Sequence, residues 1–233
     1  MRPSHDDPEQ KPKKFQRKVR SFMRRQGRMS DRQKIALHSL LPRFGIEFTP
    51  QLLNLDLYFG RSVPKVLEIG FGMGQSLARL ADDHPDMDFL GIEVHEPGVG
   101  SLLATMQEQH IANIRVMCHD AVEILQYCIA DNSLTAVNIF FPDPWPKKRH
   151  HKRRLIQTKF VDILVSKMTP HAQLHIATDW QPYAQWIEAI LTAHPMLALS
   201  NNPPMFPRTT TKFEQRGIKL GHDVYEFLYI KTQ

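Results

Sequence analysis

The stretch Lys65-Val-Leu-Glu-Ile-Gly-Phe-Gly-Met-Gly74 decides the fold of this chain. Residues 65–69 form a short apolar run typical of a buried strand, and glycines follow at alternate positions. Residues 75–81 then have apolar side chains at helical spacing. A strand, a glycine turn and a helix open a nucleotide-binding unit, because glycine lets the backbone pass close to a ligand.

The glycine loop matches neither common phosphate-binding pattern. Gln75 stands where GxGxxG has its third glycine, and no Gly-Lys-Ser/Thr follows as in a P-loop. Alone, such a loop is weak evidence, since many are only tight turns. The next apolar run, 88–94, strengthens it, because Glu93 lies where an acidic residue accepts hydrogen bonds from ribose hydroxyls.

The rest of the chain alternates between strand and helix patterns. Strands are expected at 114–120, 134–141 and 173–178, and helices at 97–110, 121–130, 155–168 and 183–193. The last run, 223–230, has no room for a crossover helix before it and is expected to be antiparallel. The pattern predicts an α/β fold with a mostly parallel sheet, helices on both faces and a C-terminal antiparallel strand.

Positive charge is concentrated in two parts of the chain. The net charge is +6, but residues 1–34 hold 12 Lys or Arg against 4 Asp or Glu, so the remainder nets −2. We expect 1–34 to be a basic, largely disordered arm, which Phe22 and Met23 could attach to the body. Residues 35–233 are expected to form one domain, with a helix that follows a cap at Ser30 and ends before Pro42.

Composition excludes several classes. Two cysteines, Cys118 and Cys128, and scattered histidines give no metal-ligand spacing and no disulfide framework. No apolar run approaches membrane-spanning length, and the basic N-terminus lacks the apolar segment of a secretory signal. We therefore expect a cytoplasmic protein with no structural metal and no membrane partner.

The second basic block begins at a proline-rich turn. Asp143 lies within Phe141-Pro-Asp-Pro-Trp-Pro146, after the strand expected at 134–141, on a turn that the prolines stiffen. Seven Lys or Arg and two His follow in residues 147–159, with no acidic residue. A carboxylate on a rigid turn beside dense positive charge suggests chemistry on a polyanion such as nucleic acid.

Acidic residues recur in or at the ends of the first four expected strands: Glu68, Glu93, Asp120 and Asp143. The carboxyl ends of parallel strands meet at one edge of the sheet, so these side chains should surround one ligand. Carboxylates would repel a phosphate-bearing dinucleotide but suit a cationic cofactor with an adenosine half. This favours S-adenosylmethionine over NAD.

The motifs resemble those of the bacterial tRNA (guanine-N(7)-)-methyltransferase family. They are Glu68–Gly74, Glu93, Asp120, Phe141–Leu155 with its Pro-Asp-Pro-Trp-Pro-Lys-Lys-Arg-His signature, Thr178-Asp179 and Thr211–Glu214. The resemblance implies a Rossmann-like class I SAM-dependent methyltransferase with tRNA as its partner. It implies that Glu68, Gly70, Gly72, Glu93, Asp120 and Asp143 bind the cofactor, with Asp143 also catalytic. It further implies that Lys147, Asp179, Thr211, Lys212, Phe213 and Glu214 contact the substrate, and that Arg149, His150, His151, Lys152, Arg153 and Arg154 contact RNA.

Several alternatives stay open at this point. The chain could methylate an exocyclic amino group instead, or it could bind RNA without catalysis on a methyltransferase scaffold. The decisive carboxylate could be Asp143, Asp179 or Glu214, and Phe213 could stack on a displaced base. No obligate protein partner is inferred, and a monomer and a homodimer are both compatible with the sequence.

Overall fold

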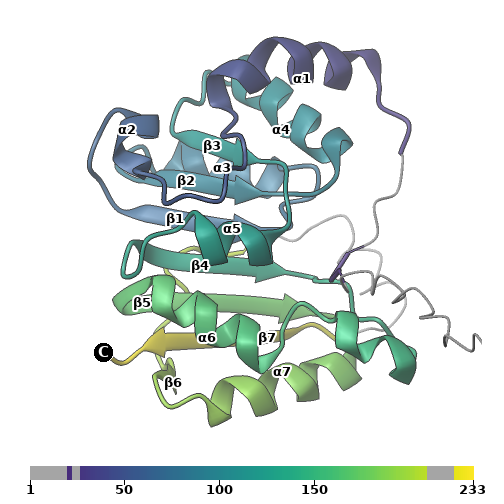
Figure 1. The fold of residues 1–233 in the computed structure, drawn as a ribbon, viewed down its shortest axis with the longest axis vertical. Helices are drawn as coiled ribbons and strands as arrows, with labels where there is room; N and C mark the ends of the chain where they lie inside the picture. Colours follow the sequence, from purple (N-terminus) through teal and green to yellow (C-terminus); the bar gives the residue numbers. More distant parts are fainter. Residues whose placement is uncertain (1–19, 23–26, 209–222) are drawn as a thin grey trace, which may run out of the picture.

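The computed structural model describes residues 20–22, 27–208 and 223–233 (Figure 1). In chain order the elements are α1 (Asp31–Phe44), α2 (Leu55–Phe59), β1 (Lys65–Ile69), α3 (Gln75–Asp83), β2 (Asp88–Ile92), α4 (Glu96–Glu108), β3 (Ile114–Met117), α5 (Ala121–Tyr127), β4 (Leu134–Phe140), η1 (Lys148–Arg153), α6 (Thr158–Lys167), β5 (Met168–Thr178), α7 (Gln181–Ala193), β6 (Leu197–Leu199) and β7 (Tyr225–Lys231).

The described strands form one seven-stranded sheet in the order β3-β2-β1-β4-β5-β7-β6. Strands β1 to β5 are parallel, and β7 runs antiparallel to β5, with Gln173 opposite Ile230 and Thr178 opposite Tyr225. The predicted fold class, including the antiparallel C-terminal strand, is therefore confirmed. The chain proceeds outward from β1 in one direction and from β4 in the other. The boundary between β1 and β4 is thus the switch point where open α/β sheets bind ligands.

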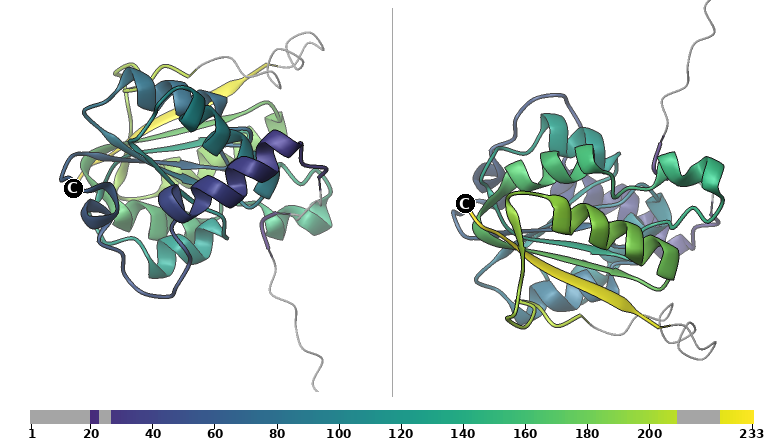
Figure 2. Two further views of the ribbon diagram at one scale, coloured as in Figure 1. Left: turned by 90° about the horizontal axis from the view of Figure 1, so that it is seen from above. Right: turned by 90° about the horizontal axis from the view of Figure 1, so that it is seen from below.

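Helices cover both faces of the sheet, as the views from above and from below show (Figure 2). On one face, Leu67 and Ile69 of β1 belong to a core with buried residues of α5, α6 and α7. On the other, Val66 belongs to a core with buried residues of α1, α3 and α4. The alternation of β1 side chains between two apolar cores explains why the run 65–69 has no exposed polar face.

Some boundaries differ from the sequence pattern. α1 begins at Asp31, inside the range assigned to the arm, because Ser30 and Gln33 form a capping box. Pro42 does not end this helix, since the Gly45 N–H still closes the last turn on the Leu41 carbonyl at 2.7 Å. The elements α2, β6 and η1 were not predicted. Strand β5 starts at Met168 rather than 173, because Met168 pairs with Leu134 of β4 across an irregular register.

No helix in the described ranges is long and apolar enough to cross a membrane.

Candidate functional site

The glycine loop has a backbone that only glycine adopts without strain. Gly70, Gly72 and Gly74 have φ values of 77°, 58° and 76°. A Cβ on Gly70 or Gly72 would have no atom within 4 Å, so space is open above the loop. On its other side the loop is packed closely, because a Cβ on Gly98 of α4 would lie 2.2 Å from the Gly72 carbonyl oxygen. The loop is therefore fixed from one side and accessible from the other.

Glu93 joins this loop to the segment after β2. The Gly72 N–H donates to Glu93 Oε2 at 2.9 Å, and the Val94 and His95 N–H groups donate to Oε1 at 2.7 and 3.1 Å. The side chain is buried. A carboxylate has about four acceptor positions, so one position on Oε2 is left for a ligand hydroxyl. Glu93 shapes the loop in addition to its expected contact with ribose.

Asp120, Asp143 and Asp179 lie at neighbouring strand ends. Asp120 caps α5, since its Oδ1 accepts the Val122 N–H at 3.0 Å, and it is partly exposed. Asp143 is exposed on the turn after β4. Asp179 follows β5, whose Ala177 pairs with Phe140 of β4, and it is partly exposed. The sheet thus brings the three carboxylates to its carboxyl edge, with Asp143 and Asp179 on adjacent strands.

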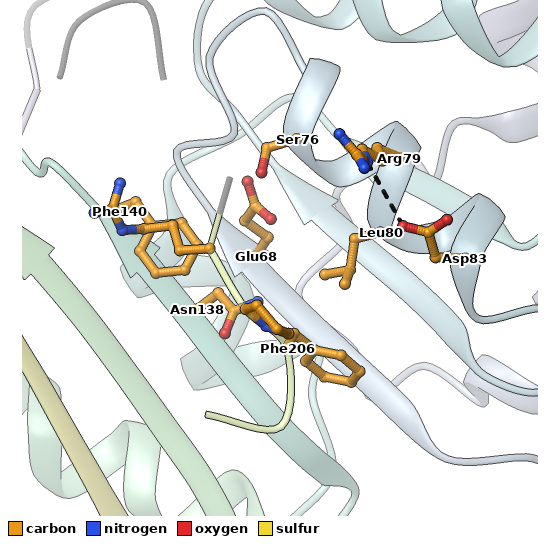
Figure 3. Close-up of a pocket in the computed structure, with 10 residues that line it drawn as sticks. Glu68, Ser76, Arg79, Leu80, Asp83, Asn138, Phe140 and Phe206 are labelled. Atoms are coloured by element: carbon orange, nitrogen blue, oxygen red, sulfur yellow. Dashed lines mark ion pairs between the residues drawn. The ribbon is translucent and has the colours of Figure 1, made fainter. Parts of the chain in front are cut away.

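Glu68 is placed differently from the other acidic residues. Its side chain is 4% exposed and points into a cavity of about 30 Å³, which Asn138, Phe140, Ser76 and Arg208 help to line (Figure 3). Among the described residues, Oε2 has no hydrogen-bond partner. Burial raises the pKa of Glu68 to about 8. The cavity is large enough for about two waters but not for an adenosine-sized molecule. The buried Glu68 carboxyl therefore offers a hydrogen-bonding group to a ligand at the switch point between β1 and β4.

Replacement of Glu68 by Gln should stabilise the ligand-free protein at pH 8–9. Because the pKa of Glu68 is about 8 in the folded protein and 4.5 in the reference state, its contribution to stability is lost as pH rises between these values. Thermal unfolding of Glu68→Gln should therefore occur several degrees above that of the unsubstituted protein at pH 8–9, with the difference gone at pH 4.5. Glu47→Gln, at an exposed position, is the control and should show no such pH dependence.

The basic turn after Asp143 is a 3-10 helix whose cations divide into two groups. Lys147, Lys148, Arg149 and Lys152 are exposed. His150 and His151 are partly exposed. Partial burial and the adjacent charges of Arg149 and Arg153 lower the pKa of His150. The four exposed cations thus follow Asp143 within nine residues.

Arg154 does not face solvent with its neighbours, contrary to the RNA contact expected for it. Its side chain is buried, and its guanidinium lies 4.8 Å from the ring centre of Tyr183 and 5.2 Å from that of Trp186. Its Nε donates to the Pro144 carbonyl at 2.9 Å. The Arg154 guanidinium packs against these two rings of α7, and its hydrogen bond to Pro144 ties the proline-rich turn to the helix. In this arrangement Arg154 positions the turn and is not available to a phosphate.

A charged network at the β5–β7 end of the edge was missed from the sequence. Arg208 pairs with Glu226 of β7 at 2.6 Å, and His175 of β5 lies 3.2 Å from the same carboxylate. The Arg208 guanidinium lies 5.2 Å from the ring centre of Phe141, two residues before Asp143. The side-chain alternation of the strand expected at 223–230 places Glu226 on the same face as Leu228, which pairs with His175. No local sequence pattern links Arg208 to this face.

The expected substrate residues Thr211, Lys212, Phe213 and Glu214 lie outside the described residues. Within the described ranges no group of three His, Cys, Asp or Glu side chains is arranged to hold a metal ion.

The fold and this edge define a class I, S-adenosylmethionine-dependent methyltransferase. The same fold occurs in an rRNA methylase from Streptococcus thermophilus, with a TM-score of 0.51 at 12% identity over 73% of this chain and 88% of that one. It also occurs in the 16S rRNA methyltransferase KamB, with a TM-score of 0.55 at 10% identity over 78% and 95% of the two chains. At these identities the likeness concerns the fold.

Closer similarity identifies the family. The family model Methyltransf_4, described as "Putative methyltransferase", matches residues 62–227. A tRNA (guanine-N(7)-)-methyltransferase from Methylobacillus flagellatus is 56% identical over 91% of each chain, and one from Alcanivorax borkumensis is 50% identical over 98% of this chain and 97% of its own length. The chain belongs to the tRNA (guanine-N(7)-)-methyltransferase family.

Proposed function

We propose that the protein transfers a methyl group from S-adenosyl-L-methionine to N(7) of the variable-loop guanine, position 46, of tRNA. The products are N(7)-methylguanosine and S-adenosylhomocysteine. One observation carries the proposal: the acidic strand ends around the glycine loop and the exposed cations of residues 147–152 occupy the same edge of the sheet. Relatives that are 50–56% identical bear the name of this activity.

The residues at the edge fit this cofactor. It supplies an electrophilic methyl group on a positively charged sulfur. Glu93 offers an acceptor for ribose, and Asp120 is placed to accept from the adenine amino group. Gly70 and Gly72 leave open space for a ligand beside the loop. Asp143 adds negative charge that favours a cation. Glu68, whose pKa burial raises to about 8, is neutral at pH 7 and provides a further hydrogen-bonding group.

The reaction makes a modest demand on proton transfer. N(7) of guanine carries a free lone pair at neutral pH, so the protein has to align this atom with the methyl group and exclude water. Asp143 and Asp179 follow adjacent strands, and either would accept hydrogen bonds from the Watson–Crick edge of guanine. Either carboxylate would also stabilise the positive charge that methylation leaves on the purine. Lys147, Thr211, Lys212, Phe213 and Glu214 complete the proposed substrate contacts.

The decisive experiment incubates unmodified tRNA with methyl-labelled cofactor and maps the labelled nucleoside. The proposal requires the label in N(7)-methylguanosine at position 46. Label on an exocyclic amino group would make the protein a different RNA methyltransferase. Cofactor binding without transfer to any tRNA would support a role in RNA binding alone. The expected cytoplasmic location and the oligomeric state, monomer or homodimer, stay predictions.

Neutral substitutions in the exposed part of the basic turn should weaken tRNA binding through charge. Each phosphate contact removed lowers the slope of log affinity against log salt by about 1. Arg149→Ala and Lys152→Ala should therefore each reduce this slope by about 1 and weaken binding at low salt. Arg43→Ala removes a charge from the last turn of α1 and is the control, with an unchanged slope. A filter-binding or anisotropy titration over a series of salt concentrations measures this slope. Unchanged slopes in both turn variants would refute RNA contact by Arg149 and Lys152.

A further inference from the structure

Trp145 has an unusual backbone for a large side chain. Its φ is 45°, in the left-handed region, which costs a residue other than glycine about 1–2 kcal/mol. Such a conformation persists only where the surroundings determine it strongly. The left-handed backbone therefore directs attention to what the indole contacts.

The indole is bound on several sides. The guanidinium of Arg153 lies 4.2 Å from the ring centre, and the His150 ring meets it edge-on at 5.8 Å. The indole N–H donates to the carbonyl of Ser21 at 3.0 Å. Ser21 belongs to residues 20–22, a described part of the N-terminal arm, which lies beside the end of β4 (Figure 1).

Arg153 holds the same part of the arm. Its Nε donates to the Arg20 carbonyl at 3.2 Å and its Nη2 to the Phe22 carbonyl at 3.4 Å. The carbonyls of residues 20, 21 and 22 thus all accept from two side chains of the basic turn. Because backbone carbonyls accept these bonds, the contact does not depend on which side chains the arm carries.

Gly27, at the end of the arm, lies near the opposite side of the cofactor edge. A Cβ on Gly27 would lie 3.6 Å from Pro97, in the first turn of α4. Residues 20–22 therefore lie at the segment after β4 and Gly27 lies near the segment after β2, and β1 with its glycine loop lies between these strands.

The charges around this contact favour a polyanionic partner. Residues 17–28 contain six Lys or Arg, and the turn from Lys147 to Arg153 adds Lys147, Lys148, Arg149, Lys152 and Arg153, with no acidic residue in either segment. The positive charge of Arg20 and that of the turn repel each other, and the hydrogen bonds to the carbonyls of residues 20–22 hold the contact against this repulsion. A polyanion bound to both would remove it.

We propose that Trp145 and Arg153 are positioning residues that hold residues 20–22 against the basic turn, so that arm and turn bind the tRNA backbone as one surface. This rests on the proposed function and extends it, since the RNA contact expected for Arg153 becomes an indirect one. Arg20 is then presented to the RNA from a defined place beside the cofactor site.

The test uses the full chain and three variants. Trp145→Leu removes the indole N–H and the stacking surface, and Arg153→Lys keeps the charge but loses the planar, two-directional donor. Lys152→Ala is the matched control, because it removes a neighbouring exposed charge without a described contact to the arm. Hydrogen exchange of residues 20–22 without tRNA and tRNA affinity are both measured, and S-adenosylmethionine affinity reports on the fold.

Arg153→Lys and Trp145→Leu should each speed exchange in residues 20–22 and weaken tRNA binding about tenfold. Lys152→Ala should weaken binding while exchange stays normal. Wild-type exchange in Arg153→Lys would overturn the proposal, whether or not affinity changed. Faster exchange with unchanged tRNA affinity would also overturn it, because the arm would then not act in binding. Failure of the unsubstituted protein to methylate guanine N(7) would instead refute the proposed function, and the exchange comparison would still test the arm contact.

Discussion

Asp143→Asn should lower the rate of guanine methylation on the order of 100-fold or more, at saturating tRNA and cofactor. The amide keeps the size of the side chain and its place on the turn after β4 but removes the negative charge. A carboxylate near the purine ring stabilises the transition state more than the ground state, because the ring becomes positive as the methyl group is transferred. The effect should therefore appear in kcat, measured by single-turnover transfer of a labelled methyl group.

Two comparisons make this result specific. Asp86→Asn changes an exposed aspartate between α3 and β2, at the opposite edge of the sheet, and should leave kcat unchanged. Asp179→Asn tests the adjacent strand end: a larger loss there than at Asp143 would transfer the catalytic role to Asp179. Near-normal turnover of Asp143→Asn with normal cofactor affinity would exclude Asp143 from catalysis.

Glu93→Ala should weaken S-adenosylmethionine binding on the order of 100-fold, since hydrogen bonds to a charged acceptor contribute about 1.5–3 kcal/mol each. The substitution removes the acceptor for the N–H groups of Gly72, Val94 and His95 together with the acceptor expected for ribose. The glycine loop then loses its connection to the segment after β2. Isothermal titration with the cofactor measures the loss.

The matched control for this substitution is Glu96→Ala. Glu96 is exposed in the first turn of α4, three positions from Glu93, and has no place in the proposed site. Its replacement should leave cofactor affinity unchanged. The tRNA salt slope should stay the same in both variants, because neither residue contacts phosphate in the proposed arrangement. Cofactor affinity within threefold of normal in Glu93→Ala would contradict the role of Glu93.

The arrangement of the sheet and the strand-end residues were predictable because their signals are local. The run 65–74 contains its own strand, turn and helix start, and the proline turn stops β4 within a residue of the expected place. Once the strands are parallel, every acidic residue at a carboxyl end must reach the same edge. Glu93, Asp120 and Asp143 could therefore be grouped without knowledge of any side-chain contact.

Other features depended on contacts between distant parts of the chain. Arg153 and Arg154 are adjacent in a uniform basic run, yet one stacks on Trp145 beside the arm and the other is buried against Tyr183 and Trp186. The short elements α2 and β6 carry too few residues for a periodic pattern.

The sequence by itself determined the main alternation of strands and helices, the family and the acidic residues at the carboxyl ends of the strands, because hydrophobic period and motif spacing are properties of neighbouring residues. Only the tertiary structure decided which of those side chains faces solvent, which is buried with an oxygen that has no partner among the described residues, as at Glu68, and which holds residues 20–22, as at Arg153. The reason is physical: burial and hydrogen bonding depend on what the closed fold brings against a side chain, and residues more than 100 positions away supply it here.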